Sequence, residues 1–218
     1  MSNKYEEGIA FILEGDTEKE FYLSLLEFLC KKHDGILERQ LDCSNSPDII
    51  YTLKTPSRHL LIKFNTVNTV TQMPHSSRWF ISQCKNKHRD VGSWIVFLCY
   101  ALDNYKNDIT KFYEGDWVNL RTSLKKKAKA VHDIAAAADI EDIILSDIEG
   151  ISRFLGSPNT MVLPTGSKGK AKLKKLFRQA NRTYHEGKRA RTLIDSLDMQ
   201  KIMDTSLAPL TMIESVIF

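Results

Sequence analysis

Apolar residues in the first half of the chain occur in short runs that have the length of β-strands. Residues 7–13 form one such run, and residues 94–100 are apolar at every position, the pattern of a strand covered on both faces. Residues 36–42 and 59–65 are predicted as two shorter strands. This order, with helices between the strands, predicts an α/β fold with an open, mostly parallel sheet flanked by helices.

The stretches between these strands carry either helical periodicity or turn residues. In residues 17–32, apolar side chains recur at the spacing of a helix. Residues 43–57 are rich in Ser, Asn, Pro and Asp and are predicted to hold at most a short helix. Residues 74–89 are predicted as a helix.

The second half is predicted to be mainly helical. The expected elements are a helix over 116–130, a strand over 131–136, one or two short helices over 139–155, a basic helix over 168–183 and short helices over 188–215. No repeat or long linker interrupts the chain. The sequence therefore predicts one structural unit with a helical C-terminal extension.

The composition of the 218 residues narrows the class of protein. The hydrophobic content of 42% is enough for a normal core, and no apolar run approaches the ~20 residues of a membrane-spanning helix. The N-terminus lacks the apolar core of a signal peptide. The four cysteines are widely spaced and form no CxxC pair, which favours reduced thiols in a cytoplasmic protein over a zinc site or disulfides.

Positive charge is concentrated in one segment. Residues 168–191 contain ten lysines and arginines and one acid, whereas the whole chain has a net charge of only +4. A local basic field on a mildly acidic body fits contact with phosphate groups. The alternative is a solvated basic helix face, which is the commoner meaning of a charge run.

Two of the strand-like runs end in an acid. Glu14 follows the first run and Asp103 follows the second. In an open α/β sheet, ligands bind at the carboxyl ends of the strands, and oxygen ligands there suit Mg²⁺ or Mn²⁺. Glu18, in the first turn of the next helix, is expected to face the same cleft. Its alternative role is a favourable charge near the helix N-terminus.

The segment Ile-Leu-Glu-Gly-Asp-Thr-Glu, which ends at Glu18, resembles the first motif of the Toprim domain. That domain is shared by topoisomerases, primases and several nucleases, and the EG-x-T-E form resembles the nuclease branch. The resemblance implies a catalytic domain over 1–160 and a basic helical extension over 161–218. It also implies that Glu14 is a metal ligand or a general acid or base.

The next motif of that family is Asp-x-Asp, and the matching positions here are Ala101-Leu102-Asp103. Alanine cannot bind a metal. Either Ala101 marks a natural lineage with a weakened site, or it is an Asp→Ala change that disables catalysis. The flanking residues match the motif and favour the Asp→Ala change, whereas a natural alanine would favour a pseudo-enzyme.

A third acidic cluster, residues 139–147, resembles the I-E-x-W-x-L-x-D segment of small bacterial Toprim proteins. By this resemblance Glu141 joins the metal site, and Asp147 belongs to the same site with a supporting or capping role. The alternative is a helix N-terminus that carries acids for its own stability.

The basic segment supplies candidates for phosphate contact. Glycines next to lysines at a helix N-terminus can hold a phosphate. By the resemblance, Lys168 or Lys170 would stabilise charge that develops on the phosphate. The residues expected to follow a nucleic-acid backbone are Lys172, Lys175, Arg178 and Arg182, with Tyr184 and His185 as stacking groups.

The first functional hypothesis is a Mg²⁺- or Mn²⁺-dependent endonuclease of Toprim type, serving bacterial phage defence or RNA processing. Its expected partners are DNA or RNA, a separate ATPase subunit and further copies of the chain, with no membrane. The second hypothesis is a catalytically silent Toprim-fold subunit that binds nucleic acid or regulates another protein. A primase-like role is the poorest candidate because no nucleotide-binding element is recognisable.

Overall fold

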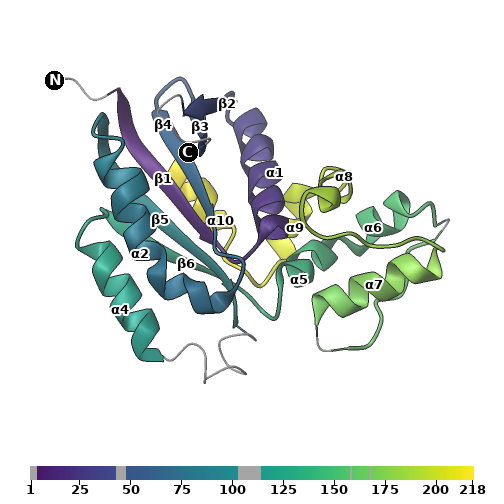
Figure 1. The fold of residues 1–218 in the computed structure, drawn as a ribbon. Helices are drawn as coiled ribbons and strands as arrows, with labels where there is room; N and C mark the ends of the chain where they lie inside the picture. Colours follow the sequence, from purple (N-terminus) through teal and green to yellow (C-terminus); the bar gives the residue numbers. More distant parts are fainter. Residues whose placement is uncertain (1–3, 43–47, 103–113, 158, 167) are drawn as a thin grey trace.

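A six-stranded sheet lies at the centre of the part of the chain that the structure describes (Figure 1). This computed structural model describes residues 4–42, 48–102, 114–157, 159–166 and 168–218. The strand order is β2-β3-β4-β1-β5-β6. The strands are β1 (Tyr5–Leu13), β2 (Ile36–Asp42), β3 (Asp48–Lys54), β4 (His59–Thr66), β5 (Val91–Ala101) and β6 (Ala130–Ala136).

The register of the central strands confirms the predicted α/β class. Strand β1 runs parallel to β4 and β5, and β5 runs parallel to β6. Ile9 of β1 pairs with Ile62 on one side and with Ile95 on the other. The sheet is therefore open, mostly parallel and flanked by helices (Figure 1).

Strand β3 was not predicted. It pairs antiparallel with both β2 and β4 and falls in the segment that was expected to hold at most a short helix. Its sequence, Asp-Ile-Ile-Tyr-Thr-Leu-Lys, is rich in β-branched and aromatic residues, which fit a strand. The turn residues on either side masked this signal in the sequence.

Helices surround the sheet. They are α1 (Asp16–Lys32), α2 (Ser76–Trp79), α4 (Glu114–Lys125), α5 (Ile140–Ile144), α6 (Ile148–Phe154), α7 (Gly169–Gln179), α8 (Arg191–Ile194), α9 (Met199–Thr205) and α10 (Thr211–Ile217). Short 3₁₀ turns are η1 (Val70–His75), η3 (Leu145–Asp147) and η4 (Gly187–Ala190), and η2 (Phe80–Asn86) is a π-helix.

The helix expected over 74–89 is broken. Pro74 lies inside the 3₁₀ turn η1, and the chain continues through the short helix α2 into the π-helix η2. Proline lacks the N–H that a continuous α-helix requires, so this interruption has a local cause. Among the described residues, no helix combines the length and the apolar character needed to cross a membrane.

The two faces of the sheet are covered by different helices (Figure 1). Along β1, Ile9, Phe11 and Leu13 belong to a core with α1 and the C-terminal helices. Ala10 and Ile12 point to the opposite face, into a second core with α2, η2 and α4. Because both faces of β1 are buried, its continuous apolar sequence is required by the fold.

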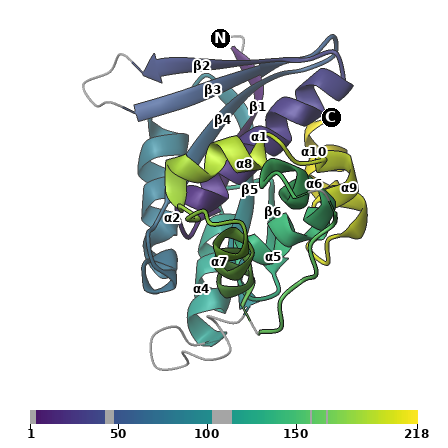
Figure 2. The ribbon, with the colours of Figure 1, turned by 90° about the vertical axis from the view of Figure 1, so that its right-hand side faces the viewer.

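Polar contacts hold the C-terminal helices to the first half of the chain. Ser24 of α1 donates a hydrogen bond to Asp195 at 2.8 Å, and Nε2 of His33 lies 2.7 Å from Oε1 of Glu214. The Arg58 guanidinium donates to the carbonyl oxygen of Val216 at 2.7 Å. Residues from α7 to α10 share one apolar core with β1 and α1. Figure 2 shows α8, α9 and α10 close to α1.

We expect Gly8→Ala to destabilise the protein. A Cβ at Gly8 would lie 2.6 Å from ring atoms of Trp94, whose side chain is only 1% exposed and cannot move away freely. Overpacking of this kind lowers the free energy of unfolding by about 1–3 kcal/mol. Gly115→Ala is the control, because no atom lies within 4 Å of its Cβ position. Chemical denaturation of both variants tests this, and equal effects would contradict it.

Candidate active site

The carboxyl ends of β1 and β5 meet beside the N-terminus of α1. Glu14 is the first residue after β1, and its Oε1 accepts a hydrogen bond from the backbone N–H of Ala101 at 2.9 Å. The structure thus brings together two positions that the sequence placed at neighbouring strand ends. Asp103, the third position of that prediction, lies outside the described residues.

Glu18 lies in the first turn of α1 and is partly buried. Burial raises the pKa of its carboxyl group to about 7, against an ordinary value near 4.5. The negative charges of Glu14 and Glu141 raise the pKa further, while a hydrogen bond from its own backbone and the charge of Lys170 oppose the rise. Glu18 is therefore only partly ionised at neutral pH.

Glu141, in α5, is 1% exposed. The hydroxyl of Tyr184 donates a hydrogen bond to its Oε1 at 3.1 Å. Burial raises the pKa of Glu141 to about 7, and the charge of Asp139 adds to this effect. A second carboxyl group that titrates near neutral pH thus comes from a different element than Glu18 and lies close enough to interact with it.

The start of α5 is built by a capping box. Asp139 accepts a hydrogen bond from the backbone of Asp142 at 3.2 Å, and the Asp142 carboxylate accepts in return from the backbone of Asp139. This arrangement orients the first turn of α5. Glu141, two residues after the cap, points into the interior as a result.

Helix α7 docks on this turn and brings Lys170 to the carboxylates. The backbone N–H of Lys170 donates to the Asp139 carboxylate at 3.1 Å. A Cβ at Gly169 would lie 2.3 Å from the backbone nitrogen of Asp142, so only glycine allows this close approach. The Lys170 ammonium pairs with Glu186 at 2.9 Å and also interacts with Glu141.

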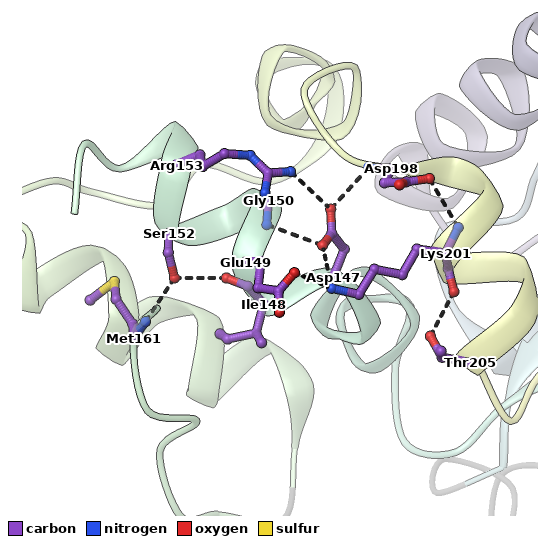
Figure 3. A network of polar contacts seen from close by, with 10 residues as sticks. All are labelled: Asp147, Ile148, Glu149, Gly150, Ser152, Arg153, Met161, Asp198, Lys201 and Thr205. Atoms are coloured by element: carbon purple, nitrogen blue, oxygen red, sulfur yellow. Dashed lines mark hydrogen bonds and ion pairs between the residues drawn. The ribbon is translucent and has the colours of Figure 1, made fainter. Parts of the chain in front are cut away.

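Asp147 does not join this site but holds α6 to α9 (Figure 3). Its carboxylate is 1% exposed and accepts hydrogen bonds from the backbone N–H groups of Gly150 at 3.1 Å and Asp198 at 2.9 Å. Lys201 lies 3.2 Å away. Burial by itself would raise the pKa of Asp147, but these partners hold it below its ordinary value. Asp147 is therefore a structural cap, and its placement in a metal site is wrong.

Several side chains that were predicted to contact nucleic acid form contacts within the protein instead. Lys172 lies 3.7 Å from the Asp142 carboxylate, and Lys175 donates to the carbonyl oxygen of Thr165 at 3.0 Å. Arg182 donates to the carbonyl oxygen of Phe154 at 2.8 Å. Arg178 and Lys168 are exposed at the surface, as is His185, whereas the Tyr184 side chain is buried at 5% exposure and cannot stack on a base.

The expected Mg²⁺ or Mn²⁺ site is also wrong. Among the described residues, no three or more His, Cys, Asp or Glu side chains are arranged to hold a metal ion. The acids expected there have protein partners instead: Glu14 binds a backbone amide, Glu141 binds Tyr184, and Asp147 caps a helix. Ala101 offers no donor atom. The described residues therefore do not fit such an ion.

Sequence reasoning missed the residues that surround Glu141. Asp139 and Glu186 were not singled out, and Tyr184 was given a stacking role. The capping box around Asp139 has a sequence signal, an acid followed three residues later by another acid just before an apolar run. The contact of Tyr184 with Glu141 has no local signal because the two residues are 43 positions apart.

Comparisons with known proteins return remote likenesses to solved structures. No protein-family model matches the chain, and no curated protein matches it. The 5'-methylthioadenosine/S-adenosyl homocysteine nucleosidase of Campylobacter jejuni is 13% identical, with a TM-score of 0.30 over 97% of this chain and 99% of that chain. A futalosine hydrolase mutant of Helicobacter pylori strain 26695 is 6% identical, with a TM-score of 0.31 over 97% and 100%.

These findings contradict the resemblance to Toprim nucleases. No protein-family model, that of the Toprim domain included, matches the chain, and the described residues hold no group of acids arranged for a metal ion. The predictions of a metal-dependent endonuclease in phage defence and of a silent Toprim-fold subunit are therefore wrong. The Asp→Ala interpretation of Ala101 loses its basis with them. At these TM-scores the two structures carry no argument about what this chain acts on.

We expect Asp147→Asn to lower the free energy of unfolding at pH 7 by about 1–3 kcal/mol, because buried N–H donors lose a charged acceptor. The pKa of Asp147 is lowered in the folded protein, so its contribution is present above pH 3.8 and is lost as the pH falls further. The difference in the free energy of unfolding between Asp147→Asn and wild type should therefore become smaller below pH 3.8. Glu149→Gln, at a neighbouring exposed residue, is the control in the same denaturation experiment, and an equal loss there would contradict the capping role.

We expect Glu18→Gln to stabilise the protein at pH 8 but not at pH 5. The raised pKa means that the folded protein holds a proton between pH 4.5 and about 7 that the unfolded chain has released. Wild type therefore loses stability as the pH rises through that window, and the glutamine variant avoids the loss. Thermal unfolding at both pH values checks this. The same gain in Glu6→Gln, at an exposed position, would argue against it.

Proposed function

We propose that this chain is a hydrolase in which Glu18 and Glu141 act together as general acid and general base. The observation that carries the proposal is the convergence of these two glutamates, from α1 and α5, beside Lys170 and Tyr184. Each carboxyl group titrates near pH 7, so the pair holds about one proton at neutral pH. One acid and one base are then present together, as hydrolysis requires.

The chemistry of the pair balances within one cycle. The ionised carboxylate takes a proton from water, whose oxygen attacks the substrate carbon. The protonated carboxyl group gives its proton to the leaving group as the bond breaks. The pair therefore ends with the same number of protons and with its roles exchanged, and proton exchange with solvent restores the starting state.

Lys170 and Tyr184 support the two glutamates. The Lys170 ammonium lowers the pKa of both Glu18 and Glu141 and keeps the pair from becoming fully neutral. The Tyr184 hydroxyl donates to Oε1 of Glu141 and leaves the other carboxyl oxygen for a substrate or water. Burial raises the pKa of this phenol far above neutral pH, so it remains a hydrogen-bond donor.

The glycosidic bond is the substrate linkage that this pair fits best. Hydrolysis of that bond commonly uses two carboxyl groups, one protonated and one ionised, on either side of the bond. Nucleosides make a suitable first panel, since they contain such a bond. The carboxyl pair supports the proposal, and the structural likeness does not.

We expect wild type to release the base from one or more nucleosides in the panel, with a bell-shaped pH profile centred near 7. Glu18→Gln and Glu141→Gln should each reduce kcat by about 10²–10⁴-fold, the usual contribution of an acid or base. Chromatography of the products measures this. Glu149→Gln, outside the site, is the matched control and should keep its activity.

Three outcomes would contradict the proposal. The first is full activity in Glu18→Gln, and the second is a pH profile that does not change in either variant. The third is an activity that disappears when EDTA is added, because the acid–base pair needs no metal ion. Failure of every nucleoside in the panel would remove nucleosides as the substrate class.

The expected partners stay predictions. A nucleic acid is the partner that the exposed cations favour, among them Lys168 and Arg178 at the two ends of α7. A separate ATPase subunit and a second copy of the chain are also predictions. Size-exclusion chromatography with and without a short oligonucleotide distinguishes nucleic-acid binding from association of the chain with itself.

A further inference from the structure

A cavity lies between α1 and the strands β2 and β3. Its volume is about 400 Å³, within the range of small-molecule sites. Side chains from α1, from β2 and β3, and from η4 and α8 line it. Figure 2 shows α8 lying alongside α1, below the end of the sheet formed by β2, β3 and β4.

The acids that line this cavity are already paired. Arg191 lies 2.5 Å from the Glu27 carboxylate and 3.4 Å from that of Glu20. Asp195, outside the cavity lining, binds the same guanidinium at 2.7 Å. This network fixes the Arg191 side chain at one wall, because three carboxylates hold it in place.

Three other cations line the cavity without such partners. Within the described part of the chain, the side chains of Lys19, Arg39 and Lys188 have no hydrogen bond and no ion pair. The lining as a whole contains four cations and two carboxylates, a net charge of +2, which Asp195 beside Arg191 lowers to +1. The excess is positive and fits an anion. A phosphate monoester offers three acceptor oxygens, one for each unpaired cation, whereas a carboxylate offers two.

The wall formed by β2 and β3 carries apolar side chains and a hydroxyl group beside Arg39. Leu37 and Ile49 are partly buried there, and the ring of Tyr51 packs edge-on against Phe64 at 5.6 Å. The Tyr51 hydroxyl has no hydrogen-bond partner among the described residues, and burial raises its pKa above the usual value. It therefore remains a donor for a ligand. A phosphate ion alone would not fill this volume and would leave Leu37 and Ile49 without an apolar partner.

We infer that this cavity binds a phosphate monoester that carries a flat aromatic base on its sugar, the chemistry of a nucleoside monophosphate and of the phosphorylated end of a nucleic-acid strand. The three unpaired cations would hold the phosphate, and Leu37 and Ile49 would cover the base. The inference does not rest on the hydrolase proposal, because none of these side chains belongs to the acid–base pair. The two sites share only α1.

Calorimetric titration with AMP, adenosine and inorganic phosphate tests the inference. We expect AMP to bind at least about tenfold more tightly than either fragment, since the fragments each lack one half of the contacts. Arg39→Gln and Lys188→Gln should each weaken AMP binding by about tenfold, the usual effect of losing one charge-assisted contact. Tyr51→Phe should weaken it by a few-fold and keep the packing on Phe64.

Lys126→Gln is the matched control. It removes one exposed positive charge after the end of α4, far from the cavity lining, and should leave AMP binding unchanged. Glu18→Gln should also keep AMP binding, which separates this cavity from the acid–base pair. Single-stranded dodecamers with and without a 5'-phosphate distinguish the two sources of ligand. A strand-end ligand predicts tighter binding of the phosphorylated dodecamer, and a free nucleotide predicts binding of AMP alone.

Several results would overturn the inference. Equal affinities for adenosine and AMP would show that the phosphate contributes nothing to binding. An equal loss in Lys126→Gln would show a general effect of net charge, and loss in Glu18→Gln would place the ligand at the acid–base pair. Absence of saturable binding by AMP and by both dodecamers would also overturn it. Thermal unfolding of each variant confirms that it is folded.

Discussion

The burial of β1 on both faces is the constraint on which the rest of the structure depends. This strand lies between β4 and β5, parallel to both, with one core on each side. Every position from Gly8 to Leu13 is buried, so the strand has to be apolar throughout. Parallel neighbours also place their carboxyl ends at one edge of the sheet. Glu14 leaves β1 at that edge, and α1 begins two residues later.

The candidate site follows from a second constraint, the cost of burying carboxylates. Glu18 and Glu141 lose much of their hydration, and this loss is the largest cause of their raised pKa values. Lys170 and Tyr184 offset part of the cost, but neither is local in sequence to the acids. The docking of α7 on α5, permitted by Gly169, brings the ammonium to the pair. The same burial that weakens ionisation makes the two groups useful as acid and base.

Two buried acids that look alike in the sequence have different electrostatic surroundings. Asp147 and Glu141 are both 1% exposed, yet their pKa values shift in opposite directions. Asp147 receives two backbone N–H groups and Lys201, so its charge is satisfied. Glu141 receives one phenol and faces other acids. The first is a structural group, and the second has the properties expected of a reactive one.

Most of the elements could be predicted because their signals are local. The runs at 7–13 and 94–100 correspond to β1 and β5, and the helical periodicity of 17–32 corresponds to α1. Strand β3 was missed since turn residues flank a short β-prone segment, and the helix over 74–89 was broken by a proline. The resemblance of the acidic motifs to the Toprim family was wrong, since no family model matches the chain. Short acidic motifs at strand ends occur for reasons other than metal binding.

The sequence by itself determined the α/β class, the buried central strands and the delivery of Glu14 and Glu18 to the carboxyl edge of the sheet. Hydrophobic periodicity and turn chemistry act over a few residues and can be recognised in one chain. Only the tertiary structure decided that Glu141 comes within electrostatic range of Glu18, that Tyr184 binds Glu141, and that Asp147 is a cap. These contacts join segments many residues apart, and their energies depend on burial and on neighbours that no local pattern specifies.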